Sequence, residues 1–310
     1  MTRRHLQIAL GALWLLAGVL QMQPFMYTRG FAEQIIAPAG QGQPGFVSAP
    51  LHLASTVIAA HPVAWNVSFA GIQLLIGAGL LVPRTARVAL AASIAWGLGV
   101  WYLGEGLGGI ARGHASLLTG APGSAFLYAV LGVAAWPHED ASRERPAAWL
   151  PAAWAAVWVG GAVLQLLPGQ NSGAAVASAV TSGSDGAPAW LARLADSAAG
   201  WAAGGGTAVV VGLALVEALV GVGSLVRVTR VPAVALGLAL TLDFWVLGQQ
   251  AGALYSGQAT DPNSGPVLAL MGIAVLGLVR SRAVGTVREA RSASNDSLSA
   301  PAVARPTFAP

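Results

Sequence analysis

The stretch GIQLLIGAGLLVPRTAR, residues 71–87, returns in altered form as LVEALVGVGSLVRVTRV, residues 215–231. An offset of 144 positions relates the two, and the same offset aligns residues far outside them. The aligned pairs include Trp14 with Trp158, Gln21 with Gln165, Trp101 with Trp245, and Pro122 with Pro266. Trp, Gln and Pro seldom coincide by chance in a chain rich in Ala, Gly and Leu. The sequence therefore predicts two ungapped copies of one unit, and differences between equivalent positions mark where the copies have specialised.

The composition excludes a soluble protein. Hydrophobic residues make up 55% of the 310 residues, charged residues only 9%, and the mean hydropathy is +0.65. A soluble domain carries about a quarter charged residues. The chain also has no Cys, which excludes a dithiol relay, a c-type haem attachment and a Cys-ligated iron–sulfur cluster. We expect a multi-pass protein of the cell membrane, with the lipid bilayer as its main partner.

Hydropathy predicts eight membrane segments. They are residues 6–23, 64–82, 88–104, 122–136, 148–167, 206–226, 231–247 and 265–279. With the N-terminus placed inside, thirteen Arg are cytoplasmic, and only Arg29, Arg112 and Arg193 fall outside. This is the positive-inside pattern, and it puts both termini in the cytoplasm. It also accounts for the net charge of +4 without a nucleic-acid partner.

The predicted fold is all-α, with two tandem four-helix units in the same orientation, related by a pseudo-twofold axis along the membrane normal. The units are residues 1–137 and 148–282, joined by a cytoplasmic linker, 138–147, and followed by a disordered tail, 283–310. We also expect interfacial helices in the long external loops 24–63 and 168–205. In the second loop Trp190, Leu194 and Trp201 recur at helical spacing, which is typical of a helix lying at headgroup level.

Two carboxylates fall inside predicted membrane segments, where each costs about 2.5–3.5 kcal/mol on insertion scales. Glu217 lies near the middle of the sixth segment, and Asp243 lies toward the outer end of the seventh. Their equivalents in the first copy are Gln73 and Gly99. Either these acids bind a ligand or carry protons, or they hydrogen-bond between helices as Gln73 would.

Further polar residues share the outer depth of Asp243. They are the equivalent pairs Gln21 with Gln165 and Glu105 with Gln249. Together with Asp243 these residues are predicted to line an outward-facing polar cavity near the pseudo-twofold axis, or else to anchor helix ends at the interface. No spacing of His or acidic residues indicates a metal site, and no catalytic motif is present.

The stretches Phe69–Arg87 and Val216–Arg230 resemble the second-helix signature of DoxX-like membrane proteins. That signature is a Glu, an apolar run containing Gly, and a Thr/Arg turn into the next helix; Glu217 matches the Glu, and Gln73 departs from it. The resemblance implies a four-helix bundle, here in tandem, and a role beside membrane redox systems, including quinone-linked ones. Related bundles work through thiols, which this Cys-free chain cannot supply.

These expectations lead to a non-catalytic integral membrane subunit or scaffold of a redox system, with a membrane or extracytoplasmic redox protein as partner. No cofactor is expected, unless a quinone is bound. The alternative is a small-solute or proton-coupled transporter that uses Glu217 and Asp243. The third hypothesis is an enzyme that acts on a lipid or quinone through Asp243, Glu105 and His61. It ranks below the other two because these residues have no spacing that is typical of a catalytic site.

Overall fold

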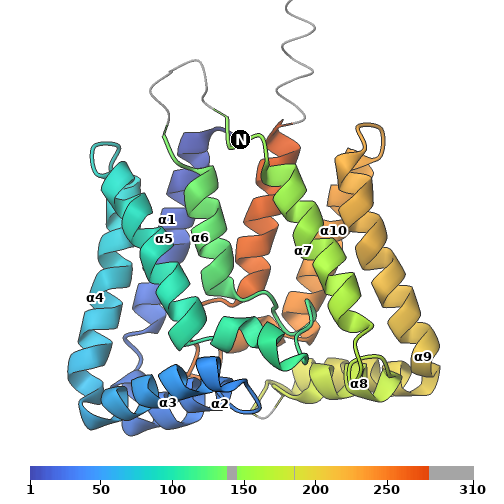
Figure 1. The fold of residues 1–310 in the computed structure, drawn as a ribbon, viewed down its shortest axis with the longest axis horizontal. Helices are drawn as coiled ribbons and strands as arrows, with labels where there is room; N and C mark the ends of the chain where they lie inside the picture. Colours follow the sequence, from blue (N-terminus) through green and yellow to red (C-terminus); the bar gives the residue numbers. More distant parts are fainter. Residues whose placement is uncertain (138–144, 185, 279–310) are drawn as a thin grey trace, which may run out of the picture.

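The computed structural model describes residues 1–137, 145–184 and 186–278, and within these ranges every regular element is a helix (Figure 1). The expected all-α fold is therefore confirmed for the described part of the chain. The predicted tail 283–310 and most of the predicted linker 138–147 lie outside it. We call residues 1–137 the first half and residues 148–278 the second half.

A helix stands at each of the eight predicted membrane segments. These helices are α1 (Arg3–Leu20), α4 (Pro62–Leu81), α5 (Ala86–Leu103), α6 (Ser124–Ala134), α7 (Leu150–Gln165), α9 (Ala189–Leu225), α10 (Arg230–Leu247) and a last helix, Ser264–Leu278. By length and composition, α4, α5, α9 and α10 are able to cross a membrane. A membrane-embedded protein is thus supported, while eight crossings remain a prediction.

Shorter elements cover one end of the bundle. They are η1 (Pro24–Tyr27), η2 (Phe31–Ile36), α2 (Ala37–Ala39), α3 (Gly45–Ala60), η3 (Gly106–Arg112), α8 (Gly173–Thr181) and η4 (Gln250–Ala253). Figure 1 shows α3 and α8 lying across this end, which we call the loop face. The N-terminus and the end of the last helix lie at the opposite end, the terminal face. The predicted topology makes the terminal face cytoplasmic.

The two halves bend the chain at equivalent positions by different means. In the first half α3 ends at Ala60 and α4 begins with Pro62, a residue suited to the first turn of a helix. In the second half the equivalent residues form one long helix, α9, which kinks at Gly206, where φ is 56° and ψ is −137°. Gly206 stands 144 positions after Pro62, and glycine adopts this backbone conformation without a Cβ penalty. The predicted interfacial helix of the second half is the part of α9 before this kink.

The predicted interfacial segments expose apolar side chains in the same register. Phe46 in α3 and Trp190 in α9 are 64% and 58% exposed, while the next residues, Val47 and Leu191, are fully buried. One face of each segment therefore packs on the bundle and the other is left apolar and exposed. This is the arrangement that a helix at a lipid headgroup layer requires.

Close helix packing in each half depends on a glycine at the same position. A Cβ on Gly77 of α4 would lie 2.9 Å from the Gly11 carbonyl oxygen of α1. A Cβ on Gly221 of α9 would lie 3.0 Å from the Ala155 carbonyl oxygen of α7. In a membrane the hydrophobic effect does not drive helices together, so such close backbone approach supplies much of the attraction.

Arginine side chains cap the C-terminal ends of two helices, α4 and α9, at the terminal face. Arg4 donates to the carbonyl oxygens of Leu80, at 2.8 Å, and Leu81 at the end of α4. Arg230 donates to the carbonyl oxygens of Ser224, at 2.7 Å, and Leu225, at 2.9 Å, at the end of α9. The last carbonyls of a helix have no partner within it, so these contacts satisfy groups that lipid could not.

The prediction of an ungapped match is wrong near the last helix of each half. The Trp101 indole N–H donates to the Pro122 carbonyl at 2.7 Å, and the equivalent Trp245 donates to the Pro262 carbonyl at 2.8 Å. Pro122 therefore corresponds to Pro262 and not to Pro266, and the offset falls from 144 to 140 positions. The loop of the first half is longer by four residues, which we place at Ser116–Thr119.

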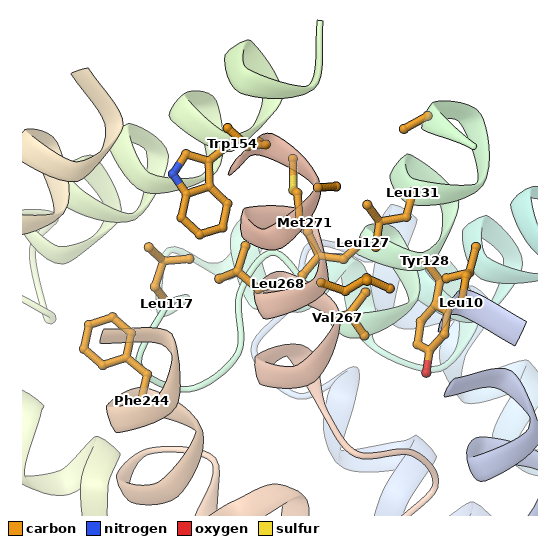
Figure 2. Packing of buried hydrophobic residues seen from close by; sticks show 14 of the residues in the cluster. Leu10, Leu117, Leu127, Tyr128, Leu131, Trp154, Phe244, Val267, Leu268 and Met271 are labelled. Atoms are coloured by element: carbon orange, nitrogen blue, oxygen red, sulfur yellow. The ribbon is translucent and has the colours of Figure 1, made fainter. Parts of the chain in front are cut away.

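The extra residues of this loop carry Leu117 and Leu118 into the main core, where they are 3% and 4% exposed. Figure 2 shows Leu117 between Trp154 and Phe244 of the second half. Ser116 Oγ donates to Gln165 Oε1 at the end of α7 at 3.0 Å. The loop of the first half is thus packed into the second half.

Substituting Ala for Gly77 should push α1 and α4 apart, because the new methyl group meets the α1 backbone at Leu15 N and at the Gly11 carbonyl oxygen. We expect a loss of about 1–3 kcal/mol in unfolding free energy, the usual cost of overpacking. Gly71→Ala on the same helix is the matched control, since a Cβ there meets nothing within 4 Å. Thermal unfolding in detergent measures both, and equal unfolding temperatures for the two variants would contradict the packing account.

Candidate functional site

A cavity of about 440 Å³ opens inside the first half, toward the loop face. Its walls come from α1, η2, α3, α4, α5, α6 and the loop before the last helix. Six aromatic side chains line it: Trp14, Phe31, Trp65, Phe69, Trp96 and Tyr128. Val57, Trp65 and Leu103 both line the cavity and are 39–41% exposed, so they form its rim. The size and the apolar walls are typical of a small-molecule site.

The polar end of the cavity holds two carboxyl groups from different halves. Ser124 Oγ, at the start of α6, lies 2.6 Å from Glu105 Oε1 and 2.8 Å from Asp261 Oδ2. A hydroxyl group has one hydrogen to donate and can donate to only one carboxylate. Both contacts are satisfied when Ser124 donates to one carboxylate and the other carboxyl, protonated, donates to Ser124 Oγ. The geometry therefore fits an acid pair that shares one proton.

Electrostatics at this pair favour the same state. Burial, together with the nearby Asp261 carboxylate, raises the pKa of Glu105 from 4.5 to about 7, although hydrogen bonds from Ser124 and from the Ala125 N–H lower it. Burial also raises the pKa of Asp261, against hydrogen bonds from Ser124 and from the Asn263 N–H. Two buried carboxyl groups that contact the same hydroxyl group are costly to ionise together, because each charge is poorly solvated and repels the other.

Four polar atoms on the cavity residues have no hydrogen-bond partner among the described residues. They are Gln73 Oε1, Trp96 Nε1, Glu105 Oε2 and the Tyr128 hydroxyl. Gln73 is 8% exposed and Tyr128 only 1%. Figure 2 shows the Tyr128 ring beside Leu10, with its hydroxyl directed away from Leu131. Buried polar groups are nearly always paired. All four atoms are almost fully buried, so a molecule in the cavity would pair with them only after their side chains turned toward it.

The equivalent space of the second half is filled by protein. Ala17 and Gly104 line the first cavity, and their equivalents are Gly161 and Gly248. A Cβ on Gly161 would lie 2.2 Å from Leu117 Cδ1, and one on Gly248 would lie 2.1 Å from the Leu118 carbonyl oxygen. Phe244, buried against Trp158, also stands where the first half has Val100. The second half therefore closes around side chains that the first half lacks.

The structure brings three of the predicted site residues together in the cavity, namely Gln21, Gln73 and Glu105. Gln21 is held there by Asn66, which accepts from Gln21 Nε2 at 2.6 Å and donates to the Gln21 carbonyl at 2.8 Å. The cavity is lined mainly by the first half, with Thr260 and Asp261 from the second half, whereas the prediction placed it near the pseudo-twofold axis. At the boundary itself Ser264 donates to the Gly120 carbonyl.

The other predicted site residues do not line this cavity. Gln165 Nε2 donates to the Gln170 carbonyl at 3.4 Å, and Gln249 Oε1 accepts from the Gly265 N–H at 3.0 Å. Glu217 is fully buried near Leu117, and neither of its oxygens has a partner among the described residues. Asp243 lies exposed on α10, because the helix turns its neighbours Thr241 and Phe244 inward instead.

Sequence reasoning missed the residues that complete the site. Asp261 reads as a turn former beside Pro262, and Ser124 and Tyr128 read as ordinary residues of an apolar helix. One signal was accessible: the copies differ in the length of the loop that carries Asp261. A gapped alignment would have shown that this loop is specialised.

Comparison of the chain with models of known protein families, with curated proteins and with solved structures finds no match.

The acid pair should make stability depend on pH. Because the pKa of Glu105 is raised in the folded state, its contribution is fully present below about 4.5 and is lost as pH rises through about 7. The unfolding free energy of the wild type should fall by up to about 1.4 kcal/mol per pH unit in this window. Glu105→Gln should fall less steeply.

Glu33→Gln is the control for this experiment, because Glu33 is exposed on η2. Unfolding temperatures in detergent between about pH 5 and about pH 8 provide the measurement. Equal slopes for the wild type and Glu105→Gln would show that Glu105 does not hold a proton in the folded state.

Proposed function

We propose that this chain is an integral protein of the cell membrane whose first half binds a small amphiphilic molecule. The observation that carries the proposal is the aromatic cavity, four of whose lining residues have a buried polar atom without a partner among the described residues. A ligand with an apolar body and a polar head would fill the cavity, and rotation of these side chains would let them pair with its head.

The rim of the cavity supports entry from the lipid. Val57 on α3, Trp65 on α4 and Leu103 on α5 are exposed apolar side chains on helices that we expect to contact the bilayer. A lipid-dissolved molecule would reach the cavity past these side chains without entering water. The loop face would be external, as the Arg distribution predicts.

Binding without chemistry fits the residues better than catalysis. The Ser124 hydroxyl is engaged by both carboxyl groups and is not free to attack a substrate, while Thr260 and Tyr128 bring two further hydroxyl groups to the cavity. We therefore keep the predicted non-catalytic role. A redox partner protein and a bound quinone remain predictions that rest on the DoxX-like resemblance alone.

Transport remains the second candidate. The deepest lining residues, Trp14 and Gln73, lie near the middle of α1 and α4, so the cavity extends about halfway through the bundle. A transporter would need a second conformation that opens the cavity to the terminal face.

Filling the cavity should abolish binding. Val100→Phe introduces the residue that the second half carries as Phe244, so the new ring has a precedent in the same fold. Val88→Phe on the same helix is the control, because Val88 is 75% exposed. The three proteins, extracted in native lipid nanodiscs, are compared by mass spectrometry of their co-purified small molecules. We expect a species enriched with the wild type and Val88→Phe and lost with Val100→Phe; identical profiles would refute binding in this cavity.

A further inference from the structure

Among the described residues, the acid pair is buried without a basic partner. The groups that affect the Glu105 carboxyl are Asp261, Ser124 and Ala125, and the residues lining the cavity include no Arg, Lys or His. Buried charges in proteins are paired or bind metals, and no group of three or more acidic or His residues in the described chain forms a metal site. With one shared proton the pair carries a single negative charge facing the cavity. A ligand with one positive charge would neutralise it.

Three of the four unpartnered atoms can accept a hydrogen bond, and the fourth, Trp96 Nε1, is a donor. Glu105 Oε2 and Gln73 Oε1 are acceptors, and the Tyr128 hydroxyl both donates and accepts. An ammonium group offers three N–H donors and no acceptor. A protonated primary amine therefore pairs with the accepting atoms, whereas a carbonyl head would leave Glu105 Oε2 and Gln73 Oε1 unpaired and would pair only with donors such as Trp96 Nε1.

The walls suit an organic cation. Phe69 lies 5.8 Å from Trp65 and 5.6 Å from Trp96, measured between ring centroids, and Trp14 lies 4.3 Å from Tyr128. Aromatic faces attract cations, with Trp the strongest, and they also pack against an apolar body. The same walls that exclude water thus favour a positive charge.

The second half lacks most of these features, although it keeps Trp158 at the position of Trp14. Glu105 is replaced by Gln249 at an offset of 144 and Trp96 by Leu240, while after the loop, at an offset of 140, Asp261 corresponds to Ala121 and Tyr128 to Leu268. This is also the half in which Leu117 and Phe244 fill the space. The half that has no equivalent cavity thus also has neither acid at the equivalent positions. This is expected if the acids serve a cation site that only the first half contains.

We infer that the cavity of the first half recognises a lipophilic organic cation of the protonated-amine class, with the Glu105–Asp261 pair as its counter-charge. This inference rests on the proposed function, and it names the chemical class of the ligand. Asp261 belongs to the second half, so the site is complete only when both halves are present. The ionisable groups that face the ligand are Glu105, Asp261 and Tyr128.

The test uses two probes that differ only in their head group, 4-phenylbutylamine and 4-phenylbutanol. Equilibrium dialysis near neutral pH against the full chain in lipid nanodiscs, with empty nanodiscs subtracted, gives the binding of each probe. We expect the amine to bind about ten-fold or more tightly than the alcohol, a difference of about 1.4 kcal/mol. Glu105→Gln should remove this preference, so that the amine binds no more tightly than the alcohol.

Glu105→Gln is expected to fold, because Gln249 holds the equivalent place and its Oε1 accepts from a helix N–H as Glu105 Oε1 does. Asp261→Asn is the second variant and should also lose the amine preference. Equal binding of amine and alcohol by the wild type, both lost in Val100→Phe, would overturn the cation inference and leave the proposed function standing. No binding of either probe above the Val100→Phe level would count against the binding cavity itself.

Discussion

The loop before the last helix of each half reaches over the other half, and its length determines which half keeps a cavity. In the first half this loop inserts Leu117 and Leu118 against Gly161 and Gly248. In the second half it is four residues shorter and brings Thr260 and Asp261 to the wall of the first cavity. Gln23 Nε2 holds it there by donating to the Ala259 carbonyl at 3.0 Å. One exchange of loops thus fills one half and supplies an acid to the other.

A membrane setting explains why this exchange is stable. Lipid offers no hydrogen bonds, so every polar group near the bundle interior needs a protein partner. The loops and the helix starts that follow them provide such partners. Ser116 donates to Gln165, and the Ser124 hydroxyl hydrogen-bonds with Glu105 of the first half and Asp261 of the second half. The groups left without partners among the described residues include four on residues that line the aromatic cavity and both oxygens of Glu217, and others lie elsewhere, on Gln43, Gln250 and Tyr255 among them. Leu117 and Glu217 Oε2 both lie beside Gly161, so the loop of the first half reaches the neighbourhood of this acid.

The sequence predicted the parts of the structure that follow from local physics. Hydropathy placed helices at all eight segments, and the repeat alignment paired Gly77 with Gly221, which the structure places at helix contacts in both halves. The predicted pairing of polar positions also identified Gln21, Gln73 and Glu105, which share the cavity. These features could be predicted because helix formation depends on residues near one another in the chain, and because the repeat pairs equivalent positions of the two halves.

The rest depends on contacts that no local pattern encodes. The orientation of Asp243 is set by which face of α10 packs inward, and hydropathy says nothing of that face. The role of Asp261 depends on a loop that crosses from one half to the other over 137 positions of sequence to meet Ser124. An assumed ungapped match concealed the difference in loop length and aligned Pro122 with the wrong proline. Length differences between copies therefore carried more functional information here than residue differences inside the helices.

An experimental structure of the variant lacking Ser116–Thr119 in lipid nanodiscs would test the central role of loop length most directly. The shortened loop should no longer place Leu117 and Leu118 beside Gly161 and Gly248, and a cavity lined by Trp158 and Glu217 should appear in the second half. An unchanged, filled second half would contradict the account, because some other feature would then close it.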